Sequence, residues 1–484
     1  MTPPRTPNLD SAASVKAWGV ANLSRSGPAG RPSRAASKLR EITGPLTQRW
    51  LLLWSFLLAG LAIGGRGFAY LGVPPLFISE IVLVSGLAVL LLQPRWRALI
   101  AQPTTLIAIC LMGWCFLRSL PYIGVYGIDS IRDLTIVGYP TIGLAVAGAI
   151  ISNPESIPIL IGRYSRFAKV FLSVMPGLWL MGRSLGDSVP GWPWAPHVGI
   201  LDLKPGDMPV HLGGIAALIV VGWFGGKSLF WTAALVCLVG VTGMVSRGGL
   251  LAFTLALGIA FFVQPRSAWP FRMMAVVLIL LSVAIVFDIR VPMGTREREF
   301  SAQQLVDNFA SVVSSDDRGD LDDTKEWRLQ WWHDIFDYTI GGEYFWTGKG
   351  FGVNLATVDG YQVNSDNSLR SPHNGHLTLL ARGGVPALAL WIILQISWLS
   401  TIVLAYINAR RRRESNWAMW FGMLAAYWGA LMLNAAVDVY FEGPMGGVWY
   451  WSIIGLGIGS AWVFYHAPEV MRDLPSPCRS KVTR

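Results

Sequence analysis

Residues 371–408 read SPHNGHLTLLARGGVPALALWIILQISWLSTIVLAYIN, and they contain the change of composition around which the chain is organised. A long polar segment, residues 290–374, ends in Ser371-Pro372-His373-Asn374, and an apolar run over 383–408 follows it. Runs of about 20 apolar residues are typical of membrane-spanning helices, because lipid cannot hydrogen-bond a free backbone. We therefore interpret this junction as the point where a water-facing segment re-enters a membrane.

The same apolar pattern recurs along the rest of the chain. Of its 484 residues, 53% are apolar and only 14% are charged, whereas soluble domains carry about 25% charged residues. The sequence predicts an all-α, polytopic integral membrane protein with about twelve transmembrane helices and one large loop, 290–374, between the ninth and the tenth. The predicted spans are 50–66, 74–93, 101–119, 133–151, 165–184, 209–226, 228–244, 248–264, 271–289, 383–408, 417–437 and 446–465.

The distribution of Lys and Arg predicts how the chain crosses the membrane. If the N-terminus is cytoplasmic and the spans alternate, 24 of the 39 basic residues fall on the cytoplasmic side and six in the short outside loops, as the positive-inside rule requires. We expect both termini in the cytoplasm, with residues 1–49 as a disordered tail, 50–465 as the transmembrane domain and 466–484 as a short tail.

The net charge of +10 could suggest a nucleic-acid partner, but the charge pattern argues against one. Residues 290–374 hold 8 basic and 14 acidic residues and carry a net charge of −6, so we place this loop outside and expect no nucleic-acid partner. The four cysteines form no CxxC pair, and we infer neither a disulfide framework nor a zinc site.

Two arginines are candidates for binding a diphosphate. Arg247 lies in Ser246-Arg247-Gly248-Gly249 between two apolar runs, and Arg328 precedes two tryptophans on a predicted helix over 324–340. A guanidinium group can hold a phosphate through paired hydrogen bonds. The alternatives remain open: Arg247 could be a snorkelling anchor, and Arg328 could be a surface residue paired with Glu326 or with carboxylates near Asp334.

His373 is the candidate proton acceptor, because a neutral imidazole takes up a proton near neutral pH. Asn374 could orient it, Arg370 adds charge nearby, and His376 lies three residues on. The alternative for His373 is a helix-capping or interfacial histidine. HxxH is also a weak metal pattern, but we find no third ligand and predict no metal site.

Polar residues also gather after two other apolar segments, and we place all of them on the outer side. They could bind sugar hydroxyls, although ion pairs between loops explain them as well. They are Asp129, Arg132 and Asp133 after the third span, and Asp438, Tyr440 and Glu442 after the eleventh.

One outer face with arginines and a histidine favours glycan transfer from a lipid diphosphate donor, because nucleotide sugars are not supplied outside the cytoplasm. Arginines would stabilise the charge that grows on the departing diphosphate. The histidine would deprotonate the incoming hydroxyl, and attack opposite the leaving group would invert the anomeric carbon.

Several motifs together resemble the O-antigen ligase/polymerase superfamily of bacterial envelope enzymes, and the resemblance covers roughly residues 50–465. Residues 434–444, with Asp438 and Glu442, resemble the tail region of that family. The motifs are Ser246-Arg247-Gly248, Arg328 ahead of Gly348-Lys349-Gly350-Phe351-Gly352, and Ser371-Pro372-His373-Asn374-Gly375-His376-Leu377 followed by Leu380-Ala381-Arg382-Gly383-Gly384-Val385-Pro386.

This resemblance implies a GT-C-like glycosyltransferase of the bacterial inner membrane whose active site faces the periplasm. It implies an undecaprenyl-diphosphate-linked glycan as donor, a glycan or lipid as acceptor, and contact with membrane lipids. It further implies metal-independent, inverting transfer without a cofactor, with His373 as base and with Arg247 and Arg328 on the diphosphate. Ligases and polymerases share these motifs, and the long basic N-terminal tail is outside the usual pattern.

Two other functions remain as alternatives. A transporter or flippase usually shows internal repeats and charged residues near the bilayer midplane, whereas here polarity collects at one face. A scaffold for polysaccharide machinery would leave Arg247, Arg328 and His373 far apart.

Overall fold

The computed structural model describes residues 34–474, apart from 75, 226–228, 265–266, 268, 287–290, 293–298 and 301–319. Expectations for residues 1–33 and 475–484, and for most of 287–319, lie outside the described residues. The described chain is mostly helical, as the sequence predicts, and its strands form three two-stranded antiparallel ribbons. These ribbons are β1 (Gly72–Val73) with β2 (Leu76–Phe77), β3 (Gly191–Trp192) with β4 (Ala195–Gly199), and β5 (Val291–Pro292) with β6 (Glu299–Phe300).

Each predicted apolar segment coincides with a helix or a pair of helices. In chain order the helices are α2 (Arg34–Ala69), α3 (Ile78–Leu91), α4 (Trp96–Ile100), α5 (Pro103–Tyr126), α6 (Ile128–Gly138), α7 (Pro140–Ser152), α8 (Ser156–Leu185), α9 (Met208–Val221), α10 (Leu229–Val245), α11 (Arg247–Val263), α12 (Trp269–Val286), α14 (Asp320–Thr339), α15 (Leu355–Val358), α16 (Gly375–Arg411), α17 (Ser415–Ala435) and α18 (Pro444–His466). Short 3₁₀ turns are η1 (Gly186–Ser188) and η2 (Pro468–Met471).

Helix length decides how many of these helices can cross a membrane unaided. Among the described residues, four helices are long and apolar enough, and a fifth span results if the bent pair Ile128–Ile136 and Pro140–Ser152 counts as one. A helix such as α9 has 14 residues, which at 1.5 Å per residue is shorter than a hydrocarbon core of about 30 Å. The count of twelve spans therefore stays a prediction.

The first helix begins earlier than its apolar segment. α2 starts at Arg34, inside the stretch 1–49 that we expected to be a disordered tail. The Gln48 amide donates to Ser156 Oγ at 2.9 Å, and the Gln93 amide donates to Thr47 Oγ1 at 3.2 Å. These hydrogen bonds hold residues 47 and 48 of α2 against neighbouring segments.

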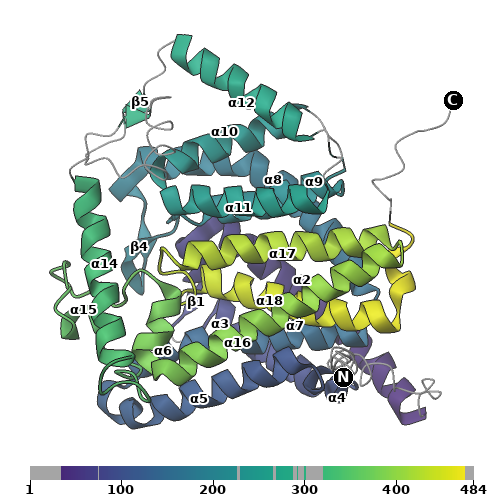
Figure 1. The fold of residues 1–484 in the computed structure, drawn as a ribbon, viewed down its shortest axis with the longest axis horizontal. Helices are drawn as coiled ribbons and strands as arrows, with labels where there is room; N and C mark the ends of the chain where they lie inside the picture. Colours follow the sequence, from purple (N-terminus) through teal and green to yellow (C-terminus); the bar gives the residue numbers. More distant parts are fainter. Residues whose placement is uncertain are drawn as a thin grey trace, which may run out of the picture.

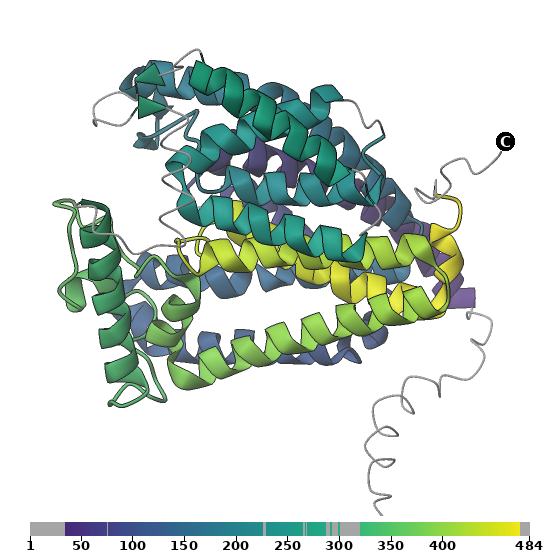
Figure 2. The same cartoon turned by 45° about the horizontal axis from the view of Figure 1, so that its top comes forward.

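The longest helices run side by side, and α14 lies across one end of them (Figures 1 and 2). α14 covers the predicted helix 324–340, and its Trp331 and Ile335 are fully buried in a small core with Leu355, Leu369 and Leu380. Protein therefore covers the row of side chains on α14 that contains Trp331. Apolar packing thus fixes α14 against the start of α16.

A break inside α16 lets the 341–352 turn bind to it. Gly384 has φ 72° and ψ −175°, a conformation that favours glycine, and Pro386 follows within the helix. Because Pro386 lacks an N–H, the carbonyl of Arg382 four residues earlier is released, and the N–H of Gly350 donates to it at 3.1 Å. The residues before the break, 375–383, therefore form a short helical segment that the turn holds in place.

Candidate functional site

His373 lies directly before this short helical segment, in a conformation that few non-glycine residues adopt. Its φ is +52°, and such backbone outliers are enriched at functional sites. Asn374 is the N-cap of α16, and its side-chain oxygen accepts the N–H groups of the second and third helical residues at 3.0 and 3.1 Å. On the other side, the Trp332 indole donates to the Pro372 carbonyl at 2.8 Å. The histidine is thus held between two fixed neighbours.

A carboxylate and an ammonium group stand next to the imidazole. His373 Nδ1 is 3.7 Å from Asp438 Oδ1, and the other oxygen of Asp438 is 2.7 Å from Lys204 Nζ. A separation of 3.7 Å is too long for a hydrogen bond, and within the described residues His373 Nδ1 has no hydrogen-bond partner. Burial by itself raises the pKa of Asp438, but His373 and the Lys204 ammonium outweigh it and hold this pKa below its usual value.

The two arginines predicted to bind a phosphate belong to segments that contact Val437. Arg328 Nη1 donates to the Val437 carbonyl at 3.2 Å, and burial lowers the pKa of Arg328 while Asp438 acts against this. Arg247 is the first residue of α11 and is partly exposed. A Cβ on the adjacent Gly248 would lie 2.5 Å from a methyl carbon of Val437. Arg247, Arg328 and His373 therefore belong to segments that meet at residues 437–438.

A second group of charges lies on the other side of His373. The Asp133 carboxylate accepts from Arg370 at 3.1 Å and from Arg382 at 2.8 Å, and Asp129 pairs with Arg132 at 3.2 Å and with Arg370 at 3.5 Å. The pairs of Asp129 and Asp133 with Arg370 join separate segments, as the ion-pair alternative for these residues expected, whereas Asp129 and Arg132 pair within α6. Arg382 is 2% exposed, so the group reaches deep into the protein.

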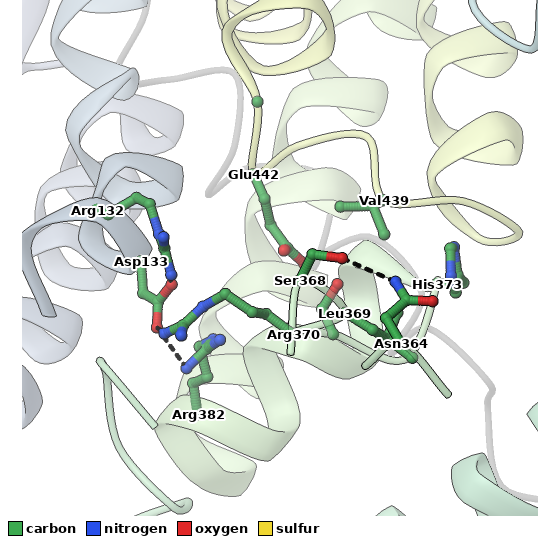
Figure 3. Close-up of a pocket in the computed structure, with 12 residues that line it drawn as sticks. Arg132, Asp133, Asn364, Ser368, Leu369, Arg370, His373, Arg382, Val439 and Glu442 are labelled. Atoms are coloured by element: carbon green, nitrogen blue, oxygen red, sulfur yellow. Dashed lines mark hydrogen bonds and ion pairs between the residues drawn. The ribbon is translucent and has the colours of Figure 1, made fainter. Parts of the chain in front are cut away.

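Four residues of this group, Arg132, Asp133, Arg370 and Arg382, line a cavity of about 430 Å³. Figure 3 shows Arg132, Arg370 and Arg382 gathered with Asp133 at one side of the cavity and His373 at the other, with Glu442 between them. Glu442 belongs to the same α17–α18 connection as Asp438. The α17–α18 connection therefore places the Asp438 carboxylate near the His373 imidazole and the Glu442 carboxylate at the cavity.

His376 does not join the site. Its Nδ1 accepts from the Trp391 indole at 3.0 Å, and its Nε2 is 3.2 Å from the Met432 carbonyl. With both ring nitrogens engaged, His376 ties α16 to α17 and offers no free lone pair to a metal ion or a substrate. Asn374 likewise acts as a helix cap in the structure, which was not the role in which we first considered it.

The structure also bears on the alternatives for the other residues. Arg328 faces Val437 and Asp438, and Asp334, its suggested surface partner, accepts from Tyr361 Oη at 2.6 Å instead. His373 does not cap α16, because Asn374 does so. Asp438 forms an ion pair between loops with Lys204, and this contact is compatible with either of the two roles suggested for it.

Sequence reasoning missed two residues of this site, Lys204 and Asp207. Both belong to Lys204-Pro205-Gly206-Asp207, a short polar turn directly before an apolar helix on the predicted outer side, and this position was an available signal. Burial raises the pKa of Asp207 to about 7, partly opposed by Lys204 and reinforced by Asp438. Burial lowers the pKa of Lys204, but Asp207 and Asp438 outweigh it and raise this pKa overall.

Arg382 was quoted only as part of a motif, although a charged residue inside an apolar helix is itself a functional signal. Its partner Asp133, at the beginning of a predicted span, gave the matching signal on the other helix.

Comparison with known proteins supports the membrane-enzyme interpretation. Comparison with curated proteins gives no match. Residues 232–392 match the family model described as O-antigen ligase. The matched range includes Arg247, Arg328, His373 and Arg382, and so covers much of the site described above. This match, over residues 232–392, supports the resemblance to the O-antigen ligase/polymerase superfamily that the motifs indicate.

Proposed function

We propose that the protein is an inner-membrane glycosyltransferase that acts on an undecaprenyl-diphosphate-linked glycan at the periplasmic face, as a ligase or as a polymerase. The family match supports an O-antigen ligase/polymerase-type membrane enzyme. The observation that carries the finer proposal is the meeting of a strained histidine with three cationic side chains at residues 437–438. The proposed orientation has both termini cytoplasmic and twelve spans, on the distribution of Lys and Arg.

In the proposed reaction the donor diphosphate lies against Arg247 and Arg328. Guanidinium groups bind phosphate oxygens with paired hydrogen bonds, and the N-terminus of α11 adds free N–H groups beside Arg247. Lys204, held by Asp438 at 2.7 Å, supplies a third positive charge. These groups stabilise the negative charge that develops on the diphosphate as the bond to the anomeric carbon breaks.

His373 removes the proton from the acceptor hydroxyl as its oxygen attacks the anomeric carbon. The proton goes to the imidazole, the new glycosidic bond forms, and the bond to the diphosphate breaks on the opposite face, which inverts the anomeric centre. The Asp438 carboxylate faces Nδ1 and would stabilise the imidazolium that results. Because arginine and lysine neutralise the leaving group, we expect transfer to persist in the presence of a chelator such as EDTA.

The alternative is a transporter or flippase for a lipid-linked glycan. The described charges of the site lie at one end of the helices and are bridged across loops, as in the pairs of Asp438 with Lys204 and of Asp133 with Arg370. A transporter would instead place its binding groups near the midplane, at broken helices related by a repeat.

The test is glycan profiling of cells that carry His373→Ala or His373→Asn, with the protein level measured in the same membranes. We expect loss of the glycan product in both variants. Asn tolerates a positive φ better than Ala, so His373→Asn separates loss of the imidazole from loss of the fold. Full retention of product in the Asn variant would remove His373 as the base.

A further inference from the structure

The cavity beside His373 has unpaired hydrogen-bonding groups of both kinds. Arg370 Nε and Arg382 Nη2 are buried donors without a hydrogen-bond partner in the described part of the chain. Glu442 Oε1 is a buried acceptor that also has no partner there. All three residues line the cavity. Buried polar atoms are normally paired, so unpaired donors and an unpaired acceptor around one cavity indicate a ligand that offers both acceptors and donors.

The charges around the cavity decide between a sugar and an anion. Three arginines, Arg132, Arg370 and Arg382, and two carboxylates, Asp133 and Glu442, line the cavity. Asp129 does not line it but pairs with Arg132 and Arg370, so the arginines and carboxylates of the whole group balance in number. An anionic ligand would satisfy the arginine donors but would bring a negative charge toward Glu442. A neutral diol satisfies all of them, because each hydroxyl accepts from a guanidinium and donates to a carboxylate.

The position of the cavity relative to His373 and the proposed diphosphate ligands indicates which substrate would bind in it. His373 lines it at one end, whereas neither Arg328 nor Lys204 is among its lining residues: Arg328 contacts the Val437 carbonyl, and Lys204 contacts Asp438 and the Val439 carbonyl. A sugar in the cavity would present a hydroxyl to His373 without occupying the place proposed for the diphosphate. With a volume of about 430 Å³, the cavity is large enough for one or two pyranose rings.

We propose that this cavity is the acceptor-sugar subsite, and that Glu442 binds a pair of neighbouring hydroxyls on an uncharged pyranose together with Arg370 and Arg382. This assignment rests on the proposed function for the role of acceptor, while the binding of a sugar can be measured without any transfer. Glu442 is a binding residue in this proposal, and the proton acceptor remains His373.

The experiment measures binding of methyl glycosides to the full-length protein in detergent micelles by saturation-transfer-difference NMR. The probes are the methyl pyranosides of glucose, galactose, mannose, rhamnose and N-acetylglucosamine, with methyl glucuronoside as the charged counterpart of the glucoside. We expect at least one neutral probe to bind and the glucuronoside to bind more weakly than the glucoside. Glu442→Gln should weaken binding about tenfold, as expected for loss of one hydrogen bond to a charged group.

Glu343→Gln is the matched control, because Glu343 is an exposed carboxylate on the neighbouring 341–352 turn, and it should leave binding unchanged. If Glu442→Gln does not fold, as judged by thermal denaturation, Arg132→Gln at the half-exposed rim replaces it and should weaken binding severalfold. Inorganic diphosphate should not displace the glycoside, because its proposed ligands, Arg247, Arg328 and Lys204, do not line the cavity.

The outcomes separate this proposal from the proposed function. His373→Ala should still bind the glycoside, because the subsite does not depend on the proton acceptor. A wild-type protein that binds the glycoside but transfers no glycan would leave the subsite intact while refuting the enzymatic role. The subsite is refuted if no neutral probe binds, if the glucuronoside is preferred, if the cavity variants bind as well as the wild type, or if diphosphate competes.

Discussion

Asp207 should make the stability of the protein fall as pH rises toward neutrality. Its side chain is buried next to Lys204 and Asp438, and among the residues that the structure describes its Oδ1 has no hydrogen-bond partner. Burial raises the pKa of Asp207 from 3.8 to about 7. A shift of about three pKa units corresponds to about 4 kcal/mol between the two protonation states.

The direction follows from proton binding. In the unfolded chain Asp207 loses its proton near pH 4, whereas the folded protein keeps it up to about pH 7. Between these values the folded state binds the additional proton, so the free energy of unfolding decreases with rising pH and levels off above the folded-state pKa. The contribution is fully present below about pH 4 and is lost by about pH 8.

Asp207→Asn removes the ionisable group but keeps the size of the side chain. The variant and the wild type should have similar unfolding free energies near pH 4, and the variant should become more stable by up to about 4 kcal/mol near pH 8. The measurement is denaturant or thermal unfolding of both proteins in detergent micelles across this pH range. The difference between the two curves cancels the titration of other groups that the substitution leaves unperturbed.

Asp202→Asn is the control, because Asp202 lies in the same connection, is partly exposed and pairs with Arg66 at 3.7 Å. It should give a difference curve with little dependence on pH. A pH-independent difference for Asp207→Asn would refute the reasoning, because it would mean that water reaches the Asp207 carboxylate in the folded protein.

Two further predictions test separate parts of the site. Arg328→Gln should raise the KM for the lipid-diphosphate donor ten- to roughly a hundredfold, because a charge-assisted hydrogen bond is lost. His333→Gln, on the exposed face of α14, is the control and should leave this KM unchanged. Equal donor KM values in the two variants would remove Arg328 from the diphosphate site. His376→Ala leaves the Trp391 indole and the Met432 carbonyl unpaired and should lower the unfolding free energy by about 2–4 kcal/mol. The transfer rate per folded molecule should stay the same. A loss of transfer in the folded variant would give His376 a role in the reaction.

Local chemistry made part of this site predictable from the sequence. The predicted helix over 324–340 matches most of α14, and the apolar run over 383–408 predicted most of α16, which begins eight residues earlier, at Gly375. We expected Arg328, His373 and Asp438 on one outer face; in the structure Arg328 and His373 both lie near Asp438, while the alternating spans on which that expectation rested stay a prediction. Side-chain contacts between distant segments, such as Lys204 with Asp438, depend on how the helices pack, and a single sequence does not contain that information.

The roles of neighbouring residues were harder to predict than their location. His373 and His376 are three positions apart and chemically alike, yet one is strained beside a carboxylate and the other is bound on both ring nitrogens. Asn374 was likewise close to the chemistry and proved to be a helix cap. What distinguishes these residues is whether a neighbouring helix already satisfies their hydrogen bonds, and only the tertiary structure shows this.

The glycine-rich turn at 348–352 and the break at Gly384 and Pro386 are two halves of one hydrogen-bond exchange. Pro386 releases the carbonyl of Arg382, and Gly350 binds that carbonyl through its N–H at 3.1 Å. The Arg382 side chain returns the contact, because its Nη1 donates to the carbonyls of Gly350 and Val353 at 3.3 and 3.0 Å. The same Nη1 is 2.8 Å from the Asp133 carboxylate.

This exchange gives the glycine-rich turn and the Gly383-Gly384-Val385-Pro386 motif a structural role beside the histidine. It fixes the short helical segment 375–383 at its far end, while the Asn374 cap fixes the near end. The strained backbone of His373 then lies beside a segment that is held on both sides, which is the condition under which such strain persists. Loosening the exchange should therefore move His373 relative to Asp438, although the residues that change are remote from the imidazole.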